Sequence, residues 1–123
     1  MSRILVIEDD VAVRTVIRKM LIKDGHEVIE ASDGKVGINL FREDPADLII
    51  TDILMPEKEG IVTIVELRRD FPNVNILAIS GGGTIASGDY LSLAKKVGAT
   101  RTLSKPFKGK ELIGVVQELL SKK

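Results

Sequence analysis

The sequence predicts an α/β fold in which helices cover both faces of a doubly wound parallel sheet of five strands. Three observations support this prediction. Five short apolar runs alternate with five stretches of helical periodicity. The chain has 123 residues with no internal repeat or linker, so it fits one compact domain over residues 1–123. Four of the five runs also end in polar or charged residues; the runs span 4–7, 27–31, 47–52, 74–79 and 100–104.

The first two helices are indicated by their apolar spacing and by their boundary residues. After the run at 4–7, residues at helical spacing are Val13, Val16, Ile17, Met20 and Leu21. Gly25 ends this helix, because glycine readily adopts the left-handed conformation found just past a helix C-terminus. Asp33 can cap the second helix, which follows the short strand at 27–31 and is halted by Pro45.

The second half of the chain repeats the alternation. Pro56 and Gly60 mark a loop after the run at 47–52, and a third helix is predicted over 61–69. Three consecutive glycines, 81–83, follow the run at 74–79 and precede a fourth helix that ends at Gly98. After the strand at 100–104, the apolar stripe of the fifth helix consists of Leu112, Val115, Val116 and Leu119.

The composition indicates an ordinary globular domain and excludes sites that need cysteine. Hydrophobic residues make up 44% of the chain and charged residues 29%, which is ordinary for a globular domain. Lys+Arg and Asp+Glu both number 18, so no general attraction to nucleic acid or to an anionic membrane is expected. Cysteine is absent, which excludes disulfides and thiolate metal sites. No run approaches the length of a membrane span or a signal peptide, so we expect a cytoplasmic protein.

Asp52 is the most informative residue, because it ends the apolar run Leu48-Ile49-Ile50 and a buried carboxylate needs a partner or a function. Polar residues also end three other runs. In a parallel sheet all these ends meet at the same edge, where ligands bind in doubly wound folds. We therefore expect convergence of the polar residues that follow the strands, namely Glu8, Asp9, Asp10, Asp52, Ser80 and Lys105.

Each residue also has a simpler structural interpretation. Asp10 is expected to cap the first helix, and Glu8 and Asp9 could equally be a solvated helix start. Ser80 could satisfy backbone groups at a strand end, and Lys105 before Pro106 could be an ordinary turn. His26, the single histidine, has no second imidazole to join it and is interpreted as structural.

Four motifs in order resemble the receiver domain of two-component response regulators, also called the CheY-like domain. The motifs are Ile-Leu-Val-Ile-Glu8-Asp9-Asp10, Leu-Ile-Ile-Thr-Asp52-Ile-Leu-Met-Pro56, Ile-Ser80-Gly81 and Leu-Ser-Lys105-Pro106-Phe107. Any one of them would be weak, but four at compatible separations cover nearly the whole chain. The resemblance implies a flavodoxin-like (βα)5 fold with strand order 2-1-3-4-5 and a cis bond before Pro106.

The resemblance also implies a chemistry. Asp52 would accept a phosphoryl group from the phosphohistidine of a sensor histidine kinase or phosphotransfer domain. Ser80 and Lys105 would each hold a phosphoryl oxygen, and the chain would act as a switch rather than as an enzyme with a separate substrate. Without metal the clustered carboxylates should repel, so at least one should have a raised pKa. The expected Mg²⁺ ligands are Glu8, Asp9, Asp52 and the backbone carbonyl of Leu54.

Two departures from the family pattern bear on how a signal would leave the site. Thr102 stands where receivers usually carry Tyr or Phe, and the segment between Ser80 and Lys105 is longer than usual. The signal could therefore travel through the glycine loop and the helix of Tyr90. The expected contact surface for a downstream protein or output domain combines the fourth helix, fifth strand and fifth helix, near Tyr90, Arg101 and Lys108.

Two alternatives differ from a phosphorylated switch. One is a degenerate receiver that binds partners without phosphorylation, which the complete set of Asp9, Asp52, Ser80 and Lys105 disfavours. The other is a small flavin- or nucleotide-binding protein, because residues 81–86 match the pattern G-x-G-x-x-A. That pattern normally follows the first strand rather than the fourth, so its position disfavours this alternative. Whether the chain is a stand-alone receiver or part of a longer regulator is left open.

Overall fold

The computed structural model describes residues 2–53, 59–80 and 92–121. Strands and helices alternate within these ranges, as the sequence predicts. The strands are β1 (Arg3–Ile7), β2 (Glu27–Ala31), β3 (Leu48–Asp52), β4 (Ile76–Ser80) and β5 (Arg101–Ser104). The helices are α1 (Val11–Lys23), α2 (Gly34–Glu43), α3 (Glu59–Asp70) and α5 (Gly109–Ser121), and residues 92–97 are also helical.

The strands form one parallel sheet in the order β2-β1-β3-β4-β5. This confirms the fold class and the strand order. β1 lies between β2 and β3, and Ile4 pairs with Val28 on one side and with Leu48 on the other. The order reverses between β1 and β3, so the topological switch point lies at their carboxyl ends. We call the edge of the sheet where the strands end the carboxyl edge.

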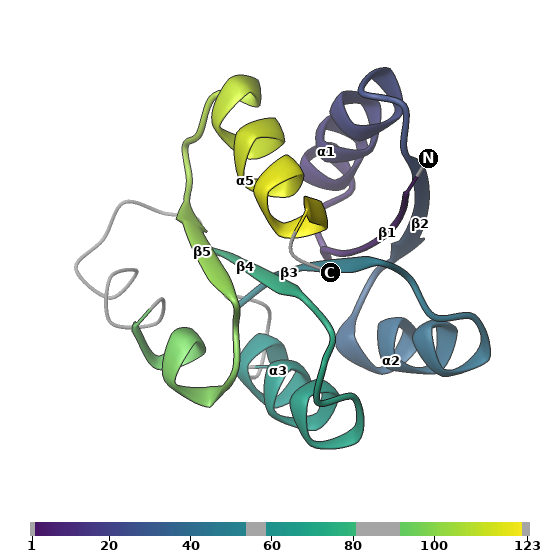
Figure 1. Ribbon diagram of the computed structural model, residues 1–123, viewed down its shortest axis with the longest axis vertical. Coiled ribbons are helices and arrows are strands. Elements are labelled where there is room, and N and C mark those ends of the chain that lie inside the picture. Colours follow the sequence, from purple (N-terminus) through teal and green to yellow (C-terminus); the bar gives the residue numbers. More distant parts are fainter. Residues whose placement is uncertain (1, 54–58, 81–91, 122–123) are drawn as a thin grey trace.

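Helices cover both faces of the sheet (Figure 1). Helices α1 and α5 lie on one face, and α2, α3 and the helical residues 92–97 lie on the other. Alternate strand residues supply the two cores: Ile4 and Val6 face α1 and α5, whereas Leu5 and Ile7 face α2 and α3. All four are fully buried or nearly so. Burial on both faces explains why the central strands are continuous apolar runs.

Several helix boundaries agree with the sequence prediction. Asp10 caps α1, because its carboxylate accepts hydrogen bonds from the backbone N–H groups of Ala12 and Val13. Asp33 caps α2 in the same way through the N–H of Val36. Gly25, just after α1, has a φ of 90°, the left-handed conformation expected past a helix end.

The start of the fourth strand differs from the prediction. The apolar run suggested a strand from residue 74, but β4 begins at Ile76. The backbone N–H of Val74 donates to the carbonyl of Phe71, so this valine belongs to the turn after α3. Its side chain still packs against the core, which explains why apolar periodicity placed it in the strand.

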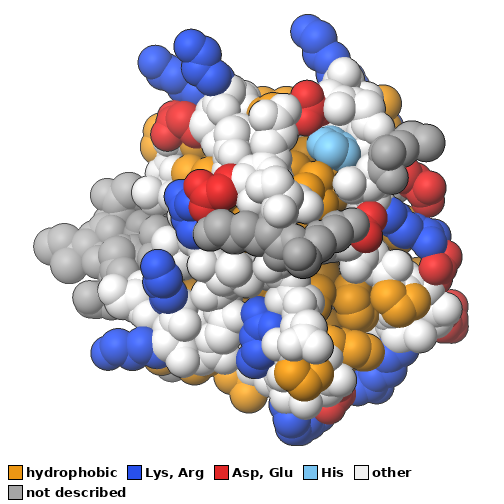
Figure 2. All heavy atoms as spheres, viewed as in Figure 1, with side chains coloured by type: hydrophobic (Ala, Val, Ile, Leu, Met, Phe, Trp, Pro, Cys, Tyr) orange, Lys and Arg blue, Asp and Glu red, His pale blue; other side chains and the backbone are white. Residues whose placement is uncertain are grey.

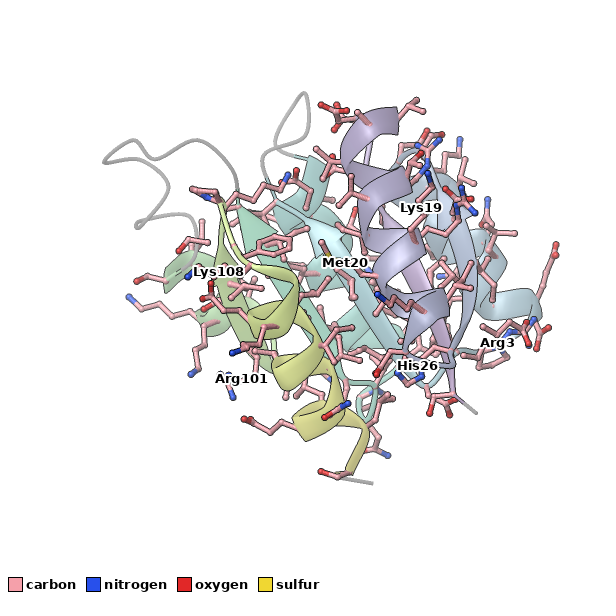
Figure 3. All side chains as sticks on the ribbon, turned by 90° about the horizontal axis from the view of Figure 1, so that it is seen from above. Arg3, Lys19, Met20, His26, Arg101 and Lys108 are labelled. Atoms are coloured by element: carbon pink, nitrogen blue, oxygen red, sulfur yellow. The ribbon has the colours of Figure 1, made fainter. Side chains whose placement is uncertain are left out.

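The interface between α1 and α5 is seen in Figure 3, where Met20 points from α1 toward α5. A methyl group placed on Gly109, the first residue of α5, would lie 3.4 Å from the Met20 sulfur. The two helices therefore pack closely on the same face of the sheet. The start of α5 thus lies near Met20 of α1, a few residues after Lys105.

The surface on one side of the molecule mixes charges of both signs, with hydrophobic side chains gathered over α2 (Figure 2). A hollow of about 710 Å³ near α2 is lined by residues that include Phe41, Phe71, Asp47 and Asn75. Asp47 and Asn75 precede β3 and β4, so this hollow lies at the edge of the sheet opposite to the carboxyl edge. Among the described helices, none has the length and apolar character needed to cross a membrane.

Candidate functional site

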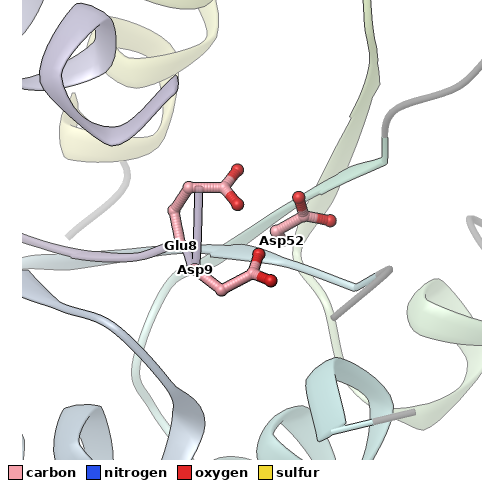
Figure 4. A group of neighbouring side chains, drawn as sticks. All are labelled: Glu8, Asp9 and Asp52. Carbon is pink, nitrogen blue, oxygen red and sulfur yellow. The ribbon is translucent and has the colours of Figure 1, made fainter. Parts of the chain in front are cut away.

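Three carboxyl groups meet at the carboxyl edge of the sheet. Glu8 and Asp9 directly follow β1, and Asp52 is the last residue of β3. Because Ile7 pairs with Thr51 in the parallel register, the residues after them emerge side by side. Figure 4 shows the three side chains converging, and their carboxylate oxygens lie within 4.8 Å of one another. Glu8 and Asp52 are buried, whereas Asp9 is exposed.

Lys105 reaches this cluster from the segment after β5. Its Nζ lies 2.9 Å from Glu8 Oε1 and 2.9 Å from Asp52 Oδ2. The backbone N–H of Lys105 donates to the carbonyl of Ser80 at 2.7 Å, which ties this segment to the end of β4. The peptide bond between Lys105 and Pro106 is cis, as the resemblance implied. One ammonium group therefore contacts two buried carboxyl groups.

Ser80 ends β4, one position beyond the residue that pairs with Asp52. Its side chain is fully buried. Within residues 2–53, 59–80 and 92–121, the Ser80 hydroxyl oxygen has no hydrogen-bond partner. The simpler interpretation of Ser80 as a side chain that satisfies nearby backbone groups therefore finds no support in this part of the chain. A buried hydroxyl without a partner costs free energy, so this group is free to donate a hydrogen bond within the part of the chain that the structure describes.

The pKa of Glu8 is raised to about 7. Burial is the main cause, because it disfavours the charged form, and the neighbouring Asp52 carboxyl adds to it. The hydrogen bonds from Lys105 and from the backbone N–H of Asp10 act in the opposite direction and are weaker. The expectation that a clustered carboxylate has a raised pKa is thereby confirmed, with Glu8 as the residue concerned.

The pKa of Lys105 is raised. Burial alone lowers the pKa of this ammonium group, but its hydrogen bonds and charge interactions with Asp52 and Glu8 together outweigh that effect. Lys105 therefore remains a cation while it contacts the carboxyl groups. It supplies positive charge directly beside the Asp52 carboxylate.

The donor set fits a small, hard divalent cation. Glu8, Asp9 and Asp52 each offer a carboxylate oxygen, the ligand type that Mg²⁺ prefers. The cluster is partly buried and partly open, so a cation could keep some of its water ligands, as Mg²⁺ usually does. Leu54, whose carbonyl was also predicted as a ligand, lies outside the described residues.

The structure describes some of the residues that are predicted to carry the signal from the site to a partner. Thr102 is half-buried on β5 and pairs in register with Ala78 of β4. Arg101 forms an ion pair with Glu118 of α5, and Lys108 is exposed near the start of that helix (Figure 3). Tyr90 and the glycine motif at 81–86 lie outside the described residues.

Sequence reasoning missed one side chain near the site. Arg14, in the first turn of α1, donates from Nη1 to the backbone carbonyl of Glu8 at 2.8 Å. Its Nε contacts Glu30 Oε1 of β2 at 3.2 Å. Nothing in the local sequence pattern links Arg14 to β2, because the contact depends on the pairing of β1 with β2.

Sequence reasoning also missed an apolar groove beside the site. The groove has a volume of about 380 Å³ and lies between α1 and the segment after β5. Its lining residues are Ala12, Val13, Val16, Ile17, Met20, Lys105, Pro106 and Phe107. Lys105 lines the groove and its ammonium group contacts Asp52, so the groove lies beside the acidic cluster.

Known proteins with similar sequences span more than this chain. The DNA-binding transcriptional regulator NtrC of Azospirillum brasilense is 35% identical over 120 residues, which cover 98% of this chain and 24% of that protein. The transcriptional regulatory protein CpxR of Escherichia coli (strain K12) is 32% identical over 120 residues, covering 98% of this chain and 50% of that protein. The chain thus spans half or less of the length of these relatives.

Solved structures of receiver domains match almost end to end. The receiver domain of NtrX from Brucella abortus superimposes with a TM-score of 0.90 at 28% identity, covering 98% of this chain and 99% of that one. A response regulator receiver domain protein from Clostridium thermocellum gives a TM-score of 0.90 at 30% identity, covering 99% and 96%. The family model described as the response regulator receiver domain matches residues 4–117. The chain therefore belongs to the receiver domains of two-component response regulators.

Proposed function

We propose that this receiver domain is switched by transfer of a phosphoryl group to Asp52, and that residues 1–123 form one such domain. An oxygen of the Asp52 carboxylate attacks the phosphorus of a donor phosphohistidine. A P–O bond forms, the P–N bond breaks, and its electron pair stays on the imidazole nitrogen of the donor. The observation that supports this most strongly is the Lys105 ammonium group, 2.9 Å from Asp52, in a cluster of oxygen ligands.

Glu8, Asp9, Asp52 and the carbonyl of Leu54 are the proposed ligands of Mg²⁺. When bound, the cation neutralises charge on the phosphoryl oxygens, as in other phosphoryl transfers. Lys105 now contacts two carboxyl groups, and we propose that its ammonium group turns to a phosphoryl oxygen once Asp52 is modified. The Ser80 hydroxyl, buried without a partner among the described residues, can donate to a second oxygen.

The proposed donor is a protein, a sensor histidine kinase or a phosphotransfer domain, and we propose that it docks on the apolar groove between α1 and residues 105–107. Lys105 lines the groove and also contacts Asp52, the residue that a donor histidine must approach. One of its apolar lining residues, Val16, is 50% exposed. A donor that buries this surface gains affinity while it positions its phosphohistidine.

Phosphorylation by such a kinase would take place in the cytoplasm, which is the compartment that we propose for this chain.

The proposed output surface combines the fourth helix, β5 and α5, near Tyr90, Arg101 and Lys108. The relatives named as transcriptional regulators are at least twice as long as this chain. If the chain belongs to such a regulator, contact with DNA would fall to an output domain, because the receiver itself carries no net charge. In a stand-alone receiver the same surface would bind a downstream protein.

The direct test is the intact mass of the protein after incubation with acetyl phosphate, with and without Mg²⁺. We expect a gain of one phosphoryl group that depends on Mg²⁺ and is lost in Asp52→Asn. Asp24→Asn is the matched control, because it makes the same change on the exposed end of α1 and should be modified like the wild type. A mass gain that persists in Asp52→Asn would place the nucleophile elsewhere. No gain, together with no Mg²⁺ binding by calorimetry, would favour an unphosphorylated binding module.

A further inference from the structure

We propose that Arg14 is a positioning residue that holds the turn carrying Glu8 and Asp9, and so sets the affinity of the site for Mg²⁺. The inference rests on the proposed function, because it assumes that these carboxylates bind the cation. It concerns a side chain that lies outside the ligand set. Arg14 acts through the backbone of Glu8 rather than on the metal or on the phosphoryl group.

The contacts of Arg14 join three elements of the fold. Its Nη1 donates to the carbonyl oxygen of Glu8 at 2.8 Å, at the carboxyl end of β1. Its Nε lies 3.2 Å from Glu30 Oε1 on β2. The side chain itself belongs to α1, whose first turn Asp10 caps. Glu30 therefore holds the guanidinium group in place while the same group holds the peptide between Glu8 and Asp9.

The Glu8 carbonyl matters because it belongs to the peptide from which Asp9 extends. Among the described residues, the Asp9 side chain makes no hydrogen bond or ion pair. Its direction is therefore set by the backbone of the turn. The N–H of Glu8 is fixed by the carbonyl of Ala31 at 3.0 Å, and its carbonyl is fixed by Arg14. Loss of Arg14 frees one side of the peptide from which Asp9 extends.

Arg18 is a suitable control, because it forms an ion pair with Glu30 as Arg14 does but does not contact the turn of Glu8 and Asp9 within the described residues. Its Nε lies 3.5 Å from Glu30 Oε2, on the same carboxylate that Arg14 uses. The Arg18 side chain is 35% exposed, against 17% for Arg14. No contact joins Arg18 to Glu8 among the hydrogen bonds and ion pairs within residues 2–53, 59–80 and 92–121. Removal of Arg18 thus removes a charge and an ion pair with Glu30 but leaves the turn intact.

Two effects on cation binding are expected when Arg14 is replaced. Partners that orient metal ligands typically contribute 10- to 100-fold to metal affinity, and we expect about 10-fold here because the contact is through the backbone. Mg²⁺ requires nearly ideal octahedral geometry, whereas Ca²⁺ tolerates irregular sites. A loosened turn should therefore weaken Mg²⁺ binding more than Ca²⁺ binding.

The experiment compares wild type with Arg14→Met, Arg14→Lys and Arg18→Met by calorimetric titration with Mg²⁺ and with Ca²⁺. Thermal unfolding without metal is measured for all four proteins. We expect Arg14→Met to bind Mg²⁺ about 10-fold more weakly, with a smaller loss for Ca²⁺. Arg14→Lys should recover part of the Mg²⁺ affinity, because an ammonium group can still donate to the Glu8 carbonyl. Arg18→Met should bind both ions like the wild type.

An Mg²⁺ affinity unchanged in Arg14→Met would overturn the inference, whatever happens to the unfolding temperature. So would an equal loss in Arg18→Met, because the effect would then come from Glu30 or from net charge. If Arg14→Met does not fold, Arg14→Ala decides, because alanine favours the helix and cannot donate to the Glu8 carbonyl. Wild-type affinity for both ions in Arg14→Ala overturns the inference, and a selective loss for Mg²⁺ supports it. Failure of the wild type itself to bind Mg²⁺ would instead refute the proposed metal site, and this inference with it.

Discussion

At the level of single residues, the site places two carboxyl groups close together in the protein interior, where their negative charges are costly to bury. Glu8 and Asp52 are buried beside each other, and the Lys105 ammonium group is shared between them. The pKa of Glu8 rises to about 7 because it is buried and next to a second carboxyl group. A divalent cation would relieve this repulsion by taking the place of the proton on Glu8. Binding of such a cation would therefore be linked to the protonation of Glu8.

The raised pKa predicts a pH dependence of Mg²⁺ affinity near neutrality. Glu8 must be deprotonated to act as a ligand, so a proton competes with the cation below about pH 7. We expect affinity to fall as the pH drops from about 8 to about 6, where Glu8 is mostly protonated. Calorimetric titrations across this range check the sign, and Glu8→Gln should flatten the profile. Affinity that rises toward low pH would contradict the assignment.

At the scale of elements, close contact between α3 and the end of β3 shapes the site. A Cβ atom on Gly60, in the first turn of α3, would lie 2.3 Å from the Cα of Ile53 and 2.4 Å from the carbonyl oxygen of Asp52. Both are backbone atoms, and moving them would distort the end of β3 at a cost in the free energy of folding. Only glycine allows this approach, which sets the helix directly against the backbone of Asp52 and Ile53.

Gly60→Ala should therefore destabilise the fold. Overpacking against backbone costs about 1–3 kcal/mol in the free energy of unfolding, and here it should also displace Asp52 and slow its phosphorylation. Gly114→Ala is the matched control. Gly114 lies inside α5 with open space around its Cβ position, so alanine should stabilise the helix by up to about 1 kcal/mol. Chemical denaturation of both variants measures the difference, and equal stabilities would show that α3 yields to the added methyl group.

At the scale of the whole molecule, the sheet order brings distant segments to one edge. Lys105 is 97 positions from Glu8 and 53 from Asp52, yet its ammonium group contacts both. The groove between α1 and residues 105–107 forms because α1 and α5 pack on the same face of the sheet. The acidic cluster and the apolar groove thus lie side by side although their residues come from distant parts of the chain.

This adjacency predicts that docking of a protein donor can be separated from phosphoryl chemistry. Val16→Glu places a charge in the groove, and we expect it to slow transfer from any phosphorylated kinase or phosphotransfer domain that modifies the wild type. Modification by acetyl phosphate should be unchanged, because this small donor does not need the groove. Ile22→Glu is the control: it has the same 50% exposure on the same helix but lies outside the groove. Equal slowing in both variants would argue against this docking site.

The amino-acid sequence predicts the fold class, the alternation of elements, and the convergence of Glu8, Asp9, Asp52 and Lys105. These follow from local patterns, because buried strands are apolar throughout and polar residues mark their ends. The strand order came from the family resemblance. Only the tertiary structure decided that Lys105 contacts both buried carboxyl groups, that Glu8 carries the raised pKa, and that Arg14 joins Glu8 to Glu30. Each of these depends on strand pairing and burial between segments far apart in the chain, which local periodicity does not encode.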